Sequence, residues 1–165
     1  MELNYCPVCG ARLVRRDHPT EAPTLYCTHC GDWRFPLFST AVTAAVWNRE
    51  HTALLLIWQY GEKDPVFPAG YVDKGETAEQ AVKRELREEL GIAVDKLRPV
   101  CTRYYAPSET LMLHFSVETA ETEATPNAEV DAWRWLTPAV ADRLITGGLA
   151  RELLDDTLKA ERKNA

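Results

Sequence analysis

The segment from Gly70 to Ile92 limits the possible folds of this chain most, because it marks both ends of one helix and fills that helix with carboxylates. Thr77 followed by Gln80 is a capping box, in which the hydroxyl accepts from a free backbone N–H and the amide reaches back. Gly91 ends the pattern, because glycine readily adopts the left-handed conformation that closes a helix. The sequence therefore predicts a helix over 77–90.

Three carboxylates share one side of this predicted helix. At about 100° per residue, Glu85, Glu88 and Glu89 fall in a single arc. The arc borders the apolar stripe of the helix, and like charges three and four residues apart repel one another. Carboxylate clusters suit Mg²⁺ or Mn²⁺, which commonly share their coordination with substrate phosphates. A solvated acidic face is the alternative, and the charge spacing favours a metal site.

The same segment resembles the Nudix box. Gly70, five residues, Glu76, seven residues and then the run Arg84–Ile92 match the pattern G-x5-E-x7-R-E-U-x-E-E-x-G-U at every fixed position, U being aliphatic. The resemblance extends over about residues 36–158. It implies an α/β fold, the Nudix α/β/α sandwich with a mixed sheet, and hydrolysis of a nucleoside diphosphate linked to another moiety.

The resemblance also implies roles for single residues. It assigns five side chains to catalysis: Glu76, Arg84, Glu85, Glu88 and Glu89. The last three would bind Mg²⁺ or Mn²⁺, and Gly70 would add its backbone carbonyl to the metal site. Arg84 would hold a carboxylate in place. Bound metal would neutralise the diphosphate, lower the pKa of a water, and hold nucleophile and phosphorus in line.

One further acidic residue, Glu129, lies in a segment that resembles the family's late strand, Asn127–Trp135. When Trp135 is aligned with the usual tryptophan of that strand, the position three before it, often a glutamate, is Ala132. Glu129 could approach the metal site from the preceding loop. We expect it to assist metal or water positioning; a plain surface glutamate is the alternative.

Two Cys-x-x-Cys pairs lie seventeen residues apart near the start of the chain, at Cys6, Cys9, Cys27 and Cys30. A glycine follows each pair, and the spacing indicates a Cys₄ zinc ribbon rather than a redox pair or coincidental thiols. So small a segment buries too little apolar surface to fold alone, so structural Zn²⁺ should stabilise it. Because composition changes near Pro36, we expect a ribbon over 1–35 and a Nudix domain over 36–165.

Apolar patterning predicts the remaining elements. Two strands joined by a polar turn should form an antiparallel hairpin, further strands should follow, the tail from Pro138 should be helical, and a polar stretch should be an exposed loop. The predicted strands are 41–47, 52–60, 67–72, 97–104, 111–119 and 130–136, and the predicted loop is 118–127.

A zinc ribbon directly before a Nudix domain resembles the bacterial NADH pyrophosphatase subgroup, and the likeness includes Leu111–Phe115. The chain departs from that subgroup at Thr102–Thr110, where its S-Q-P-W-P-F-P-x-S pattern is absent. A dinucleotide such as NAD(H) is therefore the leading substrate, with ADP-ribose, a nucleotide sugar or a noncanonical nucleoside triphosphate as alternatives. The substrate-binding candidates are Phe67, Tyr71, Arg103, Tyr104 and Tyr105. The two adjacent tyrosines could stack on a base and the arginine could contact phosphate, or they are ordinary strand-end residues.

Net charge and apolar run lengths limit the possible partners. The net charge of −6 and pI near 5.3 argue against sequence-independent nucleic-acid binding, and they imply that a polyphosphate needs metal ions to enter. The longest apolar run, Ala53–Trp58, is too short to span a membrane, and Met1–Gly10 has no signal pattern, so we expect a cytoplasmic protein. Resemblance to the zinc-bearing pyrophosphatases also predicts a homodimer. A hypothesis of another class makes the ribbon a nucleic-acid or protein binder and the Nudix domain a ligand sensor; the intact box argues against it.

Overall fold

The computed structural model describes residues 3–164, which divide into two compact units between Phe38 and Ser39. The first unit is a small antiparallel sheet in the order β1-β2-β3. Its strands are β1 (Val14–Arg16), β2 (Thr24–Cys27) and β3 (Asp32–Arg34). Its core consists of little more than Cys6, Leu13 and Cys27, which is why a metal would matter for its stability.

The second unit is built on a mixed sheet in the order β7-β8-β4-β5-β9, with β6 paired to β4. Its elements are β4 (Ser39–Asn48), β5 (Leu54–Gln59), β6 (Ala69–Tyr71), α1 (Ala78–Leu90), β7 (Lys96–Tyr105), a 3₁₀ turn (Ala106–Ser108), β8 (Thr110–Thr119), β9 (Val130–Leu136), α2 (Pro138–Leu144) and α3 (Gly148–Asn164). Strands β4 and β8 are parallel, and the other pairs are antiparallel. The first half of β4 pairs with β6 and its end pairs with β5, so the sheet branches along β4.

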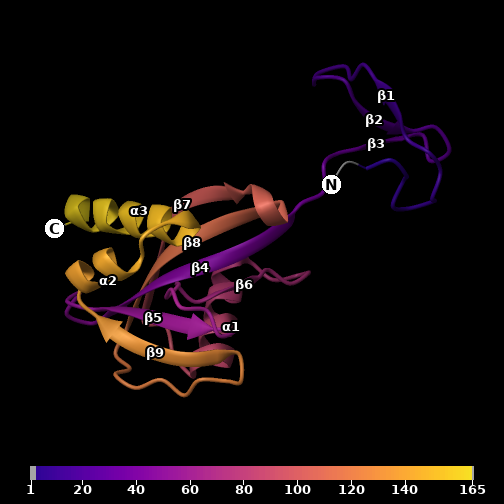
Figure 1. The fold of residues 1–165 in the computed structure, drawn as a ribbon. Helices are drawn as coiled ribbons and strands as arrows, with labels where there is room; N and C mark the ends of the chain where they lie inside the picture. Colours follow the sequence, from indigo (N-terminus) through magenta and orange to yellow (C-terminus); the bar gives the residue numbers. More distant parts are fainter. Residues whose placement is uncertain (1–2, 165) are drawn as a thin grey trace. The chain divides into compact units, whose positions relative to one another are not determined.

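Helices cover both faces of this sheet (Figure 1). Alternate residues of β4 point to opposite faces. Val42, Ala44 and Val46 pack with the apolar stripe of α1, whereas Ala45 and Trp47 pack with α2 and α3. The α/β/α sandwich implied by the resemblance is confirmed, and so are the small N-terminal sheet and its four-cysteine cluster.

Most predicted elements occur where the sequence places them. The capping box of α1 makes both of its hydrogen bonds, and Gly91 closes the helix at φ 68°. The predicted hairpin is the β4–β5 pair. Two expectations were too long. The strand expected over 67–72 is limited to β6, because Pro68 has no N–H for the sheet, and the exposed loop begins only after Thr119.

Within residues 3–164, no helix is long and apolar enough to cross a bilayer. The longest, α3, carries charged residues throughout its length.

Candidate active site and metal centre

Helix α1 holds one carboxylate of the predicted metal site inside the protein. Glu89 is 5% exposed, and its Oε2 atom is buried without a hydrogen-bond partner among the described residues. Burial raises the pKa of Glu89 to about 7, and the charges of Glu85, Glu129 and Glu88 raise it further. A buried carboxylate oxygen of this kind needs a proton or a cation, so this side chain fits a metal ligand.

Arg84 organises the carboxylates around Glu89. Its Nε and Nη2 donate to the two carboxylate oxygens of Glu76 at 3.2 and 2.6 Å. Its Nη1 lies 2.7 Å from Glu85 Oε1 and 3.3 Å from Glu88 Oε2. The hydrogen bonds from Arg84 and from the backbone N–H of Asp73 lower the pKa of Glu76. One guanidinium therefore joins three acidic side chains of the box, and Glu76 is its bidentate partner.

Gly70 permits the close approach of β6 to α1. A Cβ atom at this position would lie 1.9 Å from the Glu85 carboxyl carbon, closer than any real contact. The Glu85 side chain thus lies directly against the Gly70 backbone. The glycine of the box is required here by space rather than by a positive φ.

Glu129 comes to the same carboxylates from the loop before β9. Its Oε2 accepts a hydrogen bond of 3.2 Å from the Tyr60 hydroxyl, at the end of β5. Its charge helps to raise the pKa of Glu89, so the two carboxylates are near neighbours. The sequence analysis missed Tyr60, which carries no motif; its only local signal is its place between a strand and Gly61.

The four cysteines form a separate centre in the first unit. Their sulfur atoms all lie within 4.8 Å of one another, with 4.0 Å between Cys6 and Cys30 and 3.5 Å between Cys9 and Cys27. Tetrahedral Zn²⁺ with Zn–S bonds of about 2.3 Å requires sulfurs roughly 3.8 Å apart. The cluster therefore fits a structural zinc. Among the described residues, it is the group of His, Cys, Asp and Glu side chains whose ligand atoms already converge; the carboxylates of α1 are instead held by Arg84.

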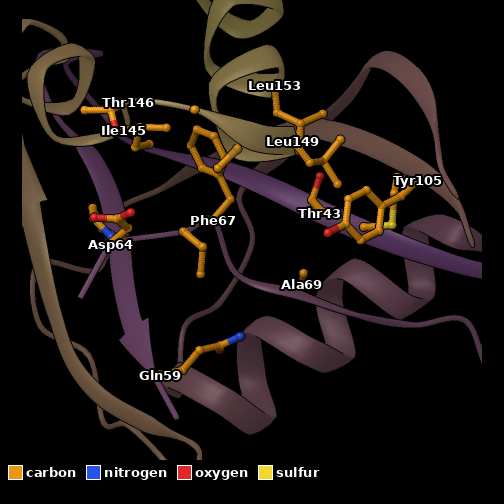
Figure 2. A pocket seen from close by; sticks show the side chains of 15 residues that line it. Thr43, Gln59, Asp64, Phe67, Ala69, Tyr105, Ile145, Thr146, Leu149 and Leu153 are labelled. Atoms are coloured by element: carbon orange, nitrogen blue, oxygen red, sulfur yellow. The ribbon is translucent and has the colours of Figure 1, made fainter. Parts of the chain in front are cut away.

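A pocket of about 370 Å³ lies on the α3 side of the sheet (Figure 2). Most of its surface is apolar, and it takes residues from β4, β6, β8, the segment before β6 and the α2–α3 region. They are Thr43, Gln59, Asp64, Pro65, Val66, Phe67, Ala69, Tyr105, Met112, Ile145, Thr146, Gly147, Leu149, Ala150 and Leu153.

The pocket and the carboxylates are separate spaces that meet at two strands. Ala69 lines the pocket, while the next residue, Gly70, lies against Glu85. Gln59 lines the pocket, and the next residue, Tyr60, binds Glu129. Consecutive residues of a strand point to opposite sides, so one molecule crossing the ends of β5 and β6 could contact both spaces.

Comparison with known proteins agrees with this geometry. A family model described as the Nudix domain matches residues 37–156, which is most of the chain. The chain belongs to the Nudix family.

Two curated relatives of this Nudix protein are both named NAD-capped RNA hydrolase NudC. The protein from Photobacterium profundum is 32% identical over 162 residues, covering 94% of this chain and 58% of the relative. The protein from Vibrio vulnificus is 30% identical over 168 residues, covering 99% of this chain and 62% of the relative. The chain thus spans about three fifths of the length of these relatives.

Two solved structures share the fold. A Nudix hydrolase from Nitrosomonas europaea has a TM-score of 0.71 at 18% identity, covering 99% of this chain and 94% of that one. The Nudix domain of Shewanella oneidensis NrtR, complexed with ADP ribose, has a TM-score of 0.66 at 16% identity, covering 82% and 94%. At these identities the likeness concerns the fold alone.

The candidate substrate residues separate into two groups around the Nudix site. Phe67 and Tyr105 line the pocket. Tyr71 exposes its ring at the surface and accepts from Arg84 through its backbone carbonyl. The other two do not line the pocket: Arg103 is ion-paired with Asp156 of α3, and Tyr104 is largely exposed.

The pocket also contains residues that the sequence analysis did not name. Met112 belongs to the Leu111–Phe115 segment already noted for its resemblance, so that segment could have indicated it. Ile145, Thr146 and Leu149 come from the α2–α3 region, about 75 residues after the end of β6, and carry no motif.

One polar group of the pocket, Thr43, is oriented from below by the buried His114. Burial lowers the pKa of His114 to about 4, so its imidazole is neutral at pH 7. Thr157 donates to the Leu153 carbonyl, so its oxygen accepts from His114 Nε2–H. His114 Nδ1 is then the acceptor for the Thr43 hydroxyl. Thr43 is left to present oxygen lone pairs, rather than a proton, to the pocket.

Proposed function

We propose that this Nudix enzyme hydrolyses the diphosphate bond of a dinucleotide of the NAD(H) type, with Mg²⁺ or Mn²⁺ held by Glu85, Glu88 and Glu89. The observation that carries the proposal is the junction between two spaces. A mostly apolar pocket, suited to a ring, adjoins a carboxylate cluster, suited to metal and phosphate, at β5 and β6.

The carboxylate cluster would supply the metal ligands. Glu89 offers a buried oxygen without a partner, Glu85 lies against the Gly70 backbone, and Glu129 approaches from the opposite loop. Divalent cations bound there would neutralise the diphosphate and acidify a water molecule. Arg84, fixed by its bidentate contact with Glu76, would keep the carboxylates oriented.

The pocket would bind one nucleoside of the substrate. The rings of Phe67 and Tyr105 and the thioether of Met112 provide apolar surface for a flat ring. Gln59 and Asp64 supply polar groups at the same pocket, where they could select the substituents of the ring or the ribose. A volume of about 370 Å³ accommodates part of a dinucleotide rather than all of it, which leaves the diphosphate near the carboxylates.

The names of the relatives favour the NAD type over other diphosphates. Hydrolysis of NAD-capped RNA, the activity in the names of both relatives, presents the NAD diphosphate on a larger molecule. ADP-ribose is the second candidate, because it contains the same diphosphate and adenosine without the second base.

A substrate panel tests the proposal. Purified protein is incubated with NADH, NAD⁺, an NAD-capped oligonucleotide, ADP-ribose, a nucleotide sugar and a noncanonical nucleoside triphosphate, each with Mg²⁺ or Mn²⁺, and the products are separated. We expect cleavage between the two phosphates, with the highest kcat/KM for an NAD-type compound. Binding without hydrolysis would favour the ligand sensor and contradict the proposal.

Two variants separate the roles of cluster and pocket. Glu88→Gln should lower kcat by at least about a hundredfold with the fold intact, because it removes a ligand charge from an exposed side chain. Tyr105→Ala should raise KM for the dinucleotide several-fold with little change in kcat, whereas Tyr104→Ala, which removes the neighbouring ring outside the pocket, should change neither. Equal effects of the two tyrosine variants would contradict the assignment of the pocket.

We also propose that Cys6, Cys9, Cys27 and Cys30 hold one structural Zn²⁺ and that the protein forms a homodimer. The sulfur distances support the zinc, and the resemblance to zinc-bearing pyrophosphatases supports the dimer. Metal analysis and light scattering test them separately. Protein purified without chelator should contain about one zinc per chain, and its mass in solution should be twice that of the chain.

A further inference from the structure

The turn that follows β5 is held in an unfavourable conformation beside the carboxylate cluster. Tyr60 has φ 56° and Gly61 has φ 71°, so two consecutive residues are left-handed. Glycine adopts this conformation freely, but a residue with a large side chain does so only when its surroundings require it. Tyr60 is also 69% exposed, so burial of its ring does not explain the conformation.

A bulge in β9 holds this turn. Trp58 pairs with Ala132 and Gln59 pairs with Val130, so Asp131 is the extra residue between them. Its Oδ2 accepts a hydrogen bond of 2.7 Å from the Gly61 backbone N–H. The bulge therefore turns a carboxylate onto the backbone of the turn and keeps Tyr60 at its left-handed position.

The phenol of Tyr60 is directed by this turn toward the catalytic carboxylates. Its hydroxyl donates to Glu129 Oε2 at 3.2 Å. Desolvation raises the pKa of Tyr60, and the hydrogen bond to Glu129 and the charges of Glu89 and Glu85 raise it further, so the phenol remains a donor. The hydrogen bond occupies one oxygen of Glu129 and limits rotation of its carboxylate.

We propose that Tyr60 is a positioning residue, which orients Glu129 toward the cation site formed with Glu89 and Glu85. This inference rests on the proposed function, because it assumes that the cluster binds divalent cations. Without the phenol, Glu129 is a mobile surface side chain that must lose rotational freedom when a cation binds. With the phenol, that ordering is already complete, and the cation binds more tightly.

The test measures Mn²⁺ binding by calorimetry in the full chain, for wild type, Tyr60→Phe, Glu129→Gln and the double variant. Tyr60→Phe removes only the hydroxyl and should weaken Mn²⁺ binding by about three- to tenfold, the range for one hydrogen bond to a partly exposed carboxylate. Tyr5→Phe, which removes an exposed phenol from the first unit, is the matched control and should leave the affinity unchanged. Saturating Mn²⁺ should restore kcat of Tyr60→Phe, with KM for the nucleotide unchanged.

The double variant decides whether Tyr60 acts through Glu129. If it does, Tyr60→Phe should cause no further loss in the Glu129→Gln background. Equal losses in both backgrounds, or an unchanged affinity of Tyr60→Phe, would overturn the inference. If Glu129→Gln binds Mn²⁺ like wild type while Glu88→Gln does not, Tyr60 loses its role and the proposed function stands. If wild type neither binds Mn²⁺ nor hydrolyses any nucleotide, the proposed function fails as well.

Discussion

Replacing Glu89 with glutamine should stabilise the protein when Mg²⁺ and Mn²⁺ are absent, although it should abolish activity. Glu89 is nearly fully buried, and its pKa lies at about 7 rather than near the ordinary 4.5. The folded state therefore binds this proton more tightly than the unfolded state does. Stability from this group is present below pH 4.5 and is lost as the pH rises to about 7.

The structure sets the size of this effect. The pKa of Glu89 is raised from 4.5 to about 7, and each pH unit corresponds to about 1.4 kcal/mol, so charging the carboxylate at pH 8 costs about 3 kcal/mol. Glutamine avoids this cost at every pH but buries an amide N–H without an identified acceptor, which costs about 1 kcal/mol. The net gain at pH 8 is about 2 kcal/mol, which corresponds to an increase in Tm of roughly 4–8 °C.

Thermal unfolding of zinc-loaded protein in buffer free of Mg²⁺ and Mn²⁺ measures this gain at pH 5 and pH 8. The Tm of wild type should fall between these pH values more than that of Glu89→Gln, and added Mg²⁺ should raise only the wild-type Tm. Glu121→Gln, at an exposed loop position, is the control and should behave like wild type. If Glu89→Gln unfolds at or below the wild-type temperature at pH 8, the reasoning from burial is wrong.

Three further variants test other contacts. Gly70→Ala should displace Glu85, because its Cβ would lie 1.9 Å from the Glu85 carboxyl carbon, and should weaken Mn²⁺ binding at least about tenfold; calorimetry giving the wild-type affinity would contradict this contact. Arg84→Lys keeps the charge but loses the bidentate geometry, so kcat should fall by about tenfold or more at constant Tm, and unchanged kinetics would remove its orienting role. Cys27→Ser should lose zinc and make the first unit sensitive to protease, whereas Cys101→Ser, at a free cysteine of β7, should retain zinc; equal zinc contents would exclude the proposed centre.

Local patterns in the sequence determined helix α1 and the identity of its carboxylates. The capping box, the closing glycine and the helical spacing all act within a few turns of chain, so Thr77, Gly91 and the arc of glutamates could be placed without a tertiary structure. The two cysteine pairs are equally local, because a metal centre of this type imposes its own spacing. The family resemblance then supplied the sandwich.

Only the tertiary structure decided which distant residues meet these local features. Arg103 was a candidate for phosphate binding, but α3 places Asp156 beside it and pairs the two. The bulge at Asp131 turns the Tyr60 phenol toward Glu129, a contact across 69 positions of sequence. The physical reason is that hydrogen-bonding patterns repeat along a chain, whereas burial, charge neighbours and pocket walls depend on which strands and helices pack together. The unpartnered oxygen of Glu89, from which most of the expected chemistry follows, exists only because α1 packs that side of its helix against the rest of the protein.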